Sequence, residues 1–216
     1  MENLFDKWKT KIPKYSEEFR APLFDSLSKK FGGSERMKVD LGKHFSNNYE
    51  LYMYAFFLGL YNDEYLPISE KAKKVDFSHE IMHWGSKGGR ILRNDFTVLQ
   101  EFIFAALIAK SDIDFIKLEK GEINEESIVK ELIQTMESYT NGGLTLIKEK
   151  LEENSNLFLQ PTAFLTMILD SKASQNKHKT EKKDIEETEK KETKKSVKSK
   201  ATSVIKGKPV KKTKKQ

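Results

Sequence analysis

The chain of 216 residues contains no cysteine and no hydrophobic run long enough to span a bilayer. The lack of cysteine excludes thiolate nucleophiles, thiolate-ligated zinc and disulfides, and it fits a reducing compartment. The longest apolar stretches, at 52–61 and 102–109, fall well short of the roughly 20 residues that a transmembrane helix needs. The N-terminus has neither the apolar core nor the cleavage site of a secretory signal, so we predict a cytoplasmic protein.

Acidic residues are missing from the last 24 residues, which hold 10 lysines. The region 171–216 has 17 lysines, 6 acids and no aromatic residue, leucine or arginine. Its net charge is +11, whereas residues 1–170 carry −5. Such a composition cannot bury enough apolar surface to offset the entropy lost on ordering. We therefore predict a folded domain at 1–170 followed by a disordered lysine-rich tail at 171–216.

Lysine blocks of this kind often serve as nucleic-acid arms, because they displace counterions from phosphates. The predicted partner is a nucleic acid, with DNA preferred over RNA. An alternative is a solubilising tail without a fixed partner. The candidate phosphate contacts in the tail are its last ten lysines: Lys194, Lys195, Lys198, Lys200, Lys206, Lys208, Lys211, Lys212, Lys214 and Lys215.

Helical periodicity dominates residues 1–170, and the strand-like alternation is limited to one short candidate at 37–42. The segments 48–61 and 96–110 are apolar almost all round, which predicts two largely buried helices, the first capped by Asn48. The aromatic side chains of the first are expected in the core. The fold class is therefore predicted to be all-α, a single compact multi-helix domain.

Amphipathic helices are expected around these two. Their predicted ranges are 1–12, 16–31 with a restart at Pro22, 125–140 capped by Asn124, 144–153, and 161–171. Because glycine favours the left-handed conformation that ends helices, the run Asn141-Gly142-Gly143 is interpreted as a helix stop between two of them.

The stretch FSHEIMHWG at 77–85 contains H-E-x-x-H, which on a helix places two histidine ligands for zinc beside a glutamate base. Here His79 and His83 would be the ligands, with Glu101 as the candidate third ligand. The competing interpretation is a short helix, capped by Asp76, whose Phe77, Ile81 and Trp84 face the core while the histidines face solvent. We prefer the second interpretation and predict neither a metal nor a cofactor.

Two glycine-containing loops carry three of the chain's four arginines. SKGGRILRN at 86–94 has Lys87, Arg90 and Arg93, and a second loop has Arg36 and Lys38 after Gly32-Gly33. Glycine backbone and guanidinium groups together suit phosphate oxygens, so these five residues are candidate phosphate contacts. The nucleotide-binding pattern G-x-x-x-x-G-K-[ST] is absent, and ordinary solvated loops are the alternative.

The chain resembles the small all-helical DndE proteins of bacterial DNA phosphorothioation in the order of two segments, LGKHFSNNYELYMYAFFLGLYNDE followed by FSHEIMHWG. In those proteins a G-x-Y helix precedes a helix that ends in H-R-G; here Trp84 replaces the basic residue. The resemblance covers roughly residues 41–86. It implies a non-enzymatic DNA-binding accessory protein beside other modification or defence components, and no binding residue is carried over.

These observations suggest three functions, in order of preference. The first is a non-enzymatic nucleic-acid-associated accessory protein with a protein partner, in a DNA modification or defence complex. The second is a helical scaffold or assembly subunit in which the tail is a polybasic tether. The third is a zinc metallopeptidase that uses His79, Glu80 and His83.

Overall fold

A computed structural model describes residues 3–28, 45–77, 79–86 and 95–169. By its contacts the chain falls into two units, Met1–Thr166 and Met167–Gln216. The tail predicted at 171–216 and the strand predicted at 37–42 lie outside the described residues. The helices and strands described between residues 3 and 160 all belong to the first unit.

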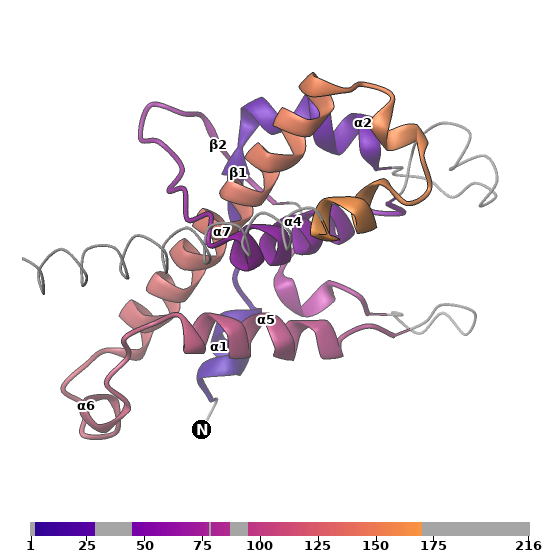
Figure 1. The fold of residues 1–216 in the computed structure, drawn as a ribbon. Helices are drawn as coiled ribbons and strands as arrows, with labels where there is room; N and C mark the ends of the chain where they lie inside the picture. Colours follow the sequence, from indigo (N-terminus) through magenta and orange to yellow (C-terminus); the bar gives the residue numbers. More distant parts are fainter. Residues whose placement is uncertain (1–2, 29–44, 78, 87–94, 170–216) are drawn as a thin grey trace, which may run out of the picture. The chain divides into compact units, whose positions relative to one another are not determined.

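Two helices, α4 (Asn48–Asn62) and α7 (Glu125–Glu153), pack against each other and form the centre of this unit. Helix α4 confirms the buried helix predicted at 48–61, although its N-cap is Asn47 and not Asn48. Helix α7 begins as predicted, with the side chain of Asn124 accepting a hydrogen bond from the backbone N–H of Glu126. In Figure 1, α7 extends well beyond its crossing with α4.

The helix stop predicted at Asn141-Gly142-Gly143 is wrong, because α7 continues through it for a further ten residues to Glu153. The glycines serve the packing of α4 on α7. A Cβ at Gly143 would lie 1.8 Å from the carbonyl oxygen of Ala55, and one at Gly59 would lie 2.0 Å from that of Tyr139. The two backbones therefore approach each other at a distance that only glycine permits.

The N-terminal segment contains short elements. Helix α1 (Leu4–Lys9) is shorter than predicted and is capped by Asn3. After β1 (Lys14–Ser16) the chain forms a 3-10 turn η1 (Glu17–Phe19), a π-helical turn η2 (Arg20–Phe24) and α2 (Asp25–Leu27). Proline lacks an N–H and its ring crowds the preceding turn, so the wider π turn accommodates Pro22 without the predicted restart.

A small sheet corrects the all-α prediction: the unit is mostly helical, with two antiparallel strands. Strand β1 pairs with β2 (Lys74–Asp76), and Tyr15 lies opposite Val75. Asp76 belongs to this strand, so the prediction that it caps a helix is wrong. The strands have three residues each, too few to produce a visible alternation in the sequence.

The remaining elements connect or flank these. Helix α5 (Val98–Ala109) confirms most of the helix predicted at 96–110, but only one of its faces is buried. Helix α6 (Phe115–Glu119) lies between α5 and α7 in the chain, and 3-10 turns occur at η3 (Ile81–His83) and η4 (Leu157–Leu159). Residues 163–169 are helical, within the range predicted at 161–171.

Aromatic rings from distant parts of the chain build much of the core. Tyr52 of α4 contacts both Phe77 and Trp84, with ring centroids 5.0 and 5.2 Å apart. Tyr15 and Phe24 join the same cluster from the N-terminal segment. The expectation that the aromatic residues of 48–61 are core residues is thus confirmed for Tyr52 and Phe56, both fully buried. None of the helices in the described ranges is long and apolar enough to cross a bilayer.

Candidate functional site

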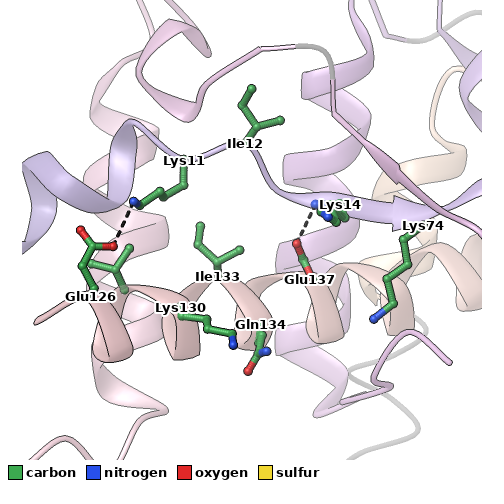
Figure 2. Close-up of a pocket in the computed structure, with 10 residues that line it drawn as sticks. Lys11, Ile12, Lys14, Lys74, Glu126, Lys130, Ile133, Gln134 and Glu137 are labelled. Atoms are coloured by element: carbon green, nitrogen blue, oxygen red, sulfur yellow. Dashed lines mark hydrogen bonds and ion pairs between the residues drawn. The ribbon is translucent and has the colours of Figure 1, made fainter. Parts of the chain in front are cut away.

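A groove of about 590 Å³ lies between the N-terminal segment and one face of α7. Its lining combines four lysines with a few acidic, amide and apolar side chains. Figure 2 shows it with the N-terminal segment on one side and α7 on the other. The lining residues are Lys11, Ile12, Lys14, Lys74, Glu126, Val129, Lys130, Ile133, Gln134 and Glu137.

The period of the α-helix places the α7 side of the groove on one face. Glu126, Lys130, Ile133 and Glu137 are spaced by four, three and four residues, so they lie one above another along the helix. On the opposite side the chain runs extended from α1 into β1, and the antiparallel pairing of β1 with β2 brings Lys74 to the groove. Segments about 60 residues apart in sequence therefore share one surface.

Ion pairs and hydrogen bonds join the two sides of the groove. Lys11 Nζ lies 3.2 Å from Glu126 Oε2, and the backbone N–H of Lys14 donates to Glu137 Oε1 at 2.7 Å. Lys14 Nζ lies 3.5 Å from Asp76 Oδ1 on the neighbouring strand. These contacts hold the N-terminal segment beside α7.

Lys74 and Lys130 are exposed, and neither makes an ion pair with another residue of the described ranges. Four ammonium groups against two carboxylates give the lining an excess of positive charge. This excess stands out because residues 1–170 carry −5 overall. The two lysines without an ion-pair partner are the groups best placed to meet an added anion.

Glu137 is a partly buried charged side chain of the groove. Burial raises the pKa of its carboxyl, while the hydrogen bond from the N–H of Lys14 and the charges of Lys74 and Lys14 act in the opposite direction. A carboxylate with a raised pKa gains protons more readily as the pH falls. The net positive charge of the groove therefore increases toward acidic pH.

The arrangement suits binding of an extended anion more than catalysis. Lysine ammonium groups act as point charges toward phosphate or carboxylate oxygens and do not need a fixed fork geometry. Ile12 on the N-terminal segment and Ile133 on α7 supply apolar surface against which the nonpolar parts of a ligand can lie. The open, mixed lining accommodates a chain-like ligand.

No pattern in the sequence predicts this groove. Lys11 and Lys14 flank Pro13 in a segment that was predicted to be mainly helical, and Lys130 is one of many charged residues on an amphipathic helix. A weak signal was present in the concentration of lysine at 7–14 and 71–74, but nothing in the sequence joins the two clusters. The strand pairing and the packing on α7 bring them together.

The phosphate-binding residues predicted from sequence lie outside the described ranges. They are Arg36 and Lys38 of the first glycine loop, Lys87, Arg90 and Arg93 of the second, and all ten lysines of the tail. None of these candidates is among the residues that line the groove.

The H-E-x-x-H segment does not form the helix on which a zinc motif depends. His79 and Glu80 precede the 3-10 turn Ile81–His83, so the two histidines do not lie on one face of an α-helix. Both histidines are exposed, and His83 Nε2 lies 3.6 Å from Glu80 Oε2. The helix predicted for FSHEIMHWG is therefore wrong, since the 3-10 turn Ile81–His83 is the one helical element among its described residues.

The packing interpretation of the same segment is confirmed. Phe77, Ile81 and Trp84 are buried, with exposed fractions of 5%, 0% and 1%. The indole N–H of Trp84 donates to the carbonyl oxygen of His79, which fixes the turn against the core. Glu101, the proposed third ligand, is exposed on α5. Within the described ranges, no three His, Asp or Glu side chains gather closely enough to hold a metal ion.

Comparison with known proteins returned no significant match to a protein-family model, to a curated protein or to a solved structure.

Proposed function

We propose that the protein is a non-enzymatic accessory protein that binds nucleic acid through two cationic surfaces, the groove on α7 and the lysine-rich tail. The observation that carries the proposal is the placement of Lys74 and Lys130, exposed and without an ion-pair partner among the described residues, in a groove that also presents the apolar side chains of Ile12 and Ile133. The tail would supply long-range attraction, and the groove would hold one stretch of the backbone in a defined place.

The preference for a polyanion over a small anion rests on the shape of the site. Its lysines are distributed along the groove and do not converge on one point, as Figure 2 shows for Lys11, Lys130 and Lys74. A single phosphate would meet one or two of them, whereas a sugar-phosphate chain meets several in succession. DNA as the particular polyanion, and a modification or defence complex as the setting, come from the DndE-type resemblance alone.

Fluorescence anisotropy with labelled duplex and single-stranded oligonucleotides tests the proposal. The full chain is compared with a Lys74→Glu/Lys130→Glu variant and with a Lys71→Glu/Lys120→Glu control. The control residues are exposed lysines outside the groove, and the change in net charge is identical. We expect the groove variant to bind about tenfold more weakly at about 0.1 M salt, and the slope of log K against log salt to fall by about 1–2.

The controls decide what a loss of binding means. Equal effects of the groove and control variants would show that only net charge matters, and the groove would lose its role. A chain ending at Lys172 separates the two surfaces: if it still binds and remains sensitive to the groove variant, the groove is an independent site. If it does not bind at all, the tail alone accounts for the affinity.

A helical scaffold or assembly subunit is the second candidate, and it is favoured by a different feature. The outward face of α5 is apolar and exposed, with Val98 and Phe102 at 55% and 58% exposure. Exposed apolar faces of this kind mark sites of protein association. Retention of binding partners by the Lys74→Glu/Lys130→Glu variant, together with their loss on substitution of Phe102, would favour this second function.

A further inference from the structure

The lysines of the groove are spread along the direction of α7. Lys11 marks one end, where its Nζ lies 3.2 Å from Glu126 Oε2, and Lys130 follows about one helical turn further along. Lys74 lies toward the other end, where its charge acts on the carboxyl of Glu137. The groove therefore presents a row of positive charges, which suits a ligand whose negative charges repeat along a chain.

The length of this row limits the size of the ligand. Glu126 and Glu137 are eleven residues apart on α7, which is about 16 Å along the helix axis. One stacked strand of nucleic acid advances about 3.4 Å for each phosphate, so the row matches about five nucleotides. A duplex of that length carries a second strand and is several times larger than a groove of about 590 Å³, so it would touch only the rim.

The lining offers little that could hold or distinguish a base. Its ten residues, all from the described part of the chain, are four lysines, two glutamates, one amide and three aliphatic residues. Proteins that hold single strands by their bases stack them on aromatic rings, and none of these ten residues is aromatic. Base edges are read by Arg, Asn and Gln side chains, and Gln134 is the only one of these in the lining.

Apolar side chains lie among the charges of the groove. Ile12 on the N-terminal segment is 42% exposed, and Ile133 is on α7 between Lys130 and Glu137. A nucleic-acid backbone alternates a charged phosphate with a sugar that has a nonpolar carbon face. Inorganic polyphosphate has no such face, so the mixture of ammonium and isoleucine groups fits the sugar-phosphate backbone better.

We infer, on the basis of the function proposed above, that the groove holds the sugar-phosphate backbone of a single nucleic-acid strand with the bases directed outward. The phosphates meet Lys11, Lys130 and Lys74 in succession, and the sugars lie against Ile12 and Ile133. Binding at the groove is then independent of base sequence. The lysine-rich tail attracts duplexes and single strands alike, so the groove supplies the preference for an unpaired strand.

The contribution of the groove is measured separately from that of the tail. In the full chain, the dissociation constant of Lys74→Glu/Lys130→Glu is divided by that of Lys71→Glu/Lys120→Glu, which has the same net charge and an intact groove. Fluorescence anisotropy gives this ratio for an oligothymidylate, an abasic strand of equal length and a duplex of equal charge. We expect a ratio of at least about fivefold for both single strands and less than about twofold for the duplex.

A second pair of variants tests the contact with the sugars. Ile12→Ser should weaken binding of the abasic strand about threefold, because it removes apolar surface from the groove. Ile116→Ser is the matched control, since Ile116 is 65% exposed on α6 and does not line the groove. Inorganic polyphosphate should bind the Ile12→Ser chain as tightly as the parent chain. Circular dichroism melting shows that each variant is folded.

The outcomes separate this inference from the function on which it rests. A ratio as high for the duplex as for the single strands, or one that disappears with the abasic strand, overturns the inference and leaves the groove as a nucleic-acid site. Equal weakening of polyphosphate and abasic strand by Ile12→Ser contradicts the contact with sugars. A ratio of about 1 for every ligand removes the groove from nucleic-acid binding altogether, and the function proposed for it fails as well.

Discussion

The carbonyl oxygen of Ala55 in α4 occupies the space that a side chain on Gly143 of α7 would need, with a built Cβ only 1.8 Å away. Contacts this short do not occur between real atoms, so any side chain at 143 forces the helices apart. Gly59 faces α7 in the same way from the other side, 2.0 Å from the carbonyl oxygen of Tyr139. The packing of α4 on α7, and with it the α7 side of the groove, depends on these glycines.

We expect Gly143→Ala to lower the free energy of unfolding by about 2–3 kcal/mol, because overpacking outweighs the better helix propensity of alanine. Urea unfolding followed by circular dichroism measures it. Gly121→Ala is the matched control: a Cβ there meets nothing within 4 Å, and only its φ of 72° opposes a side chain. Gly121→Ala should lower the free energy of unfolding by about 1 kcal/mol. Equal losses in the two variants would contradict the tight crossing.

Trp84 and His83 are neighbours in the chain, but we expect their substitution to change stability by very different amounts. Trp84 is 1% exposed and contacts the rings of Tyr52 and Phe77, so Trp84→Ala should cost about 3–5 kcal/mol of stability. His83 is exposed, so His83→Ala should change stability by less than about 0.5 kcal/mol. Thermal unfolding of both variants provides the comparison.

Metal analysis completes that test. If the purified protein contains stoichiometric zinc that a His79→Ala/His83→Ala variant has lost, the zinc metallopeptidase interpretation is revived. We expect the double variant and the parent chain to have the same zinc content, since the described residues bring no third ligand to these histidines.

Glu137 predicts a pH dependence of both stability and binding. Because burial raises the pKa of its carboxyl, the folded state binds more protons than the unfolded state between the ordinary pKa of glutamate and the raised one. The stabilisation that Glu137 contributes is therefore fully present below the pKa of its carboxyl in the unfolded state. It is lost as the pH rises through the pKa of that carboxyl in the folded state. Glu137→Gln should remove this dependence of stability on pH, because the glutamine amide does not titrate. The amide oxygen of the glutamine can still accept the hydrogen bond from the backbone N–H of Lys14.

The same substitution tests the charge balance of the groove. Removing one negative charge beside Lys14 and Lys74 should strengthen oligonucleotide binding about two- to fivefold at low salt, an effect of about 0.5–1 kcal/mol. The gain should shrink at high salt and below the pKa of Glu137, where the parent carboxyl is itself neutral. Unchanged or weaker binding at neutral pH would show that the anion does not pass near Glu137.

Asp63 and Lys110 connect the ends of α4 and α5 at the surface. Asp63 is in the left-handed conformation with φ 55°, which asparagine also tolerates, so Asp63→Asn removes the charge and keeps the backbone preference. The pKa of Asp63 is lowered by its hydrogen bond with Lys110 and by the charge of that lysine. We expect a stability loss below about 1 kcal/mol that disappears in 1 M salt, because both groups are largely exposed. Differential scanning calorimetry at two salt concentrations measures it.

The sequence anticipated those parts of the fold that local patterns specify. The apolar run of α4 and the cap at Asn124 identify helices because burial and capping act within a few residues. The burial of Phe77, Ile81 and Trp84 was also predicted from spacing alone, although the helix assumed for them was wrong. These three side chains point inward from a strand end and a 3-10 turn instead.

The predictions that failed depended on contacts between distant segments. The local preference of Gly142-Gly143 is to end a helix. Helix α7 continues through them because α4 approaches so closely that only glycine fits there. The pairing of Tyr15 with Val75 involves strands too short to carry a pattern of their own.

By itself, therefore, the sequence determined a mostly helical chain without cysteine, with an acidic body and a cationic tail, because composition and periodicity are properties of the local chain. The tertiary structure decided where helix α7 ends, which lysines share a groove, and which face of α5 remains uncovered among the described residues. Those features arise from the packing of segments far apart in sequence, and packing depends on shape and distance that no local pattern encodes.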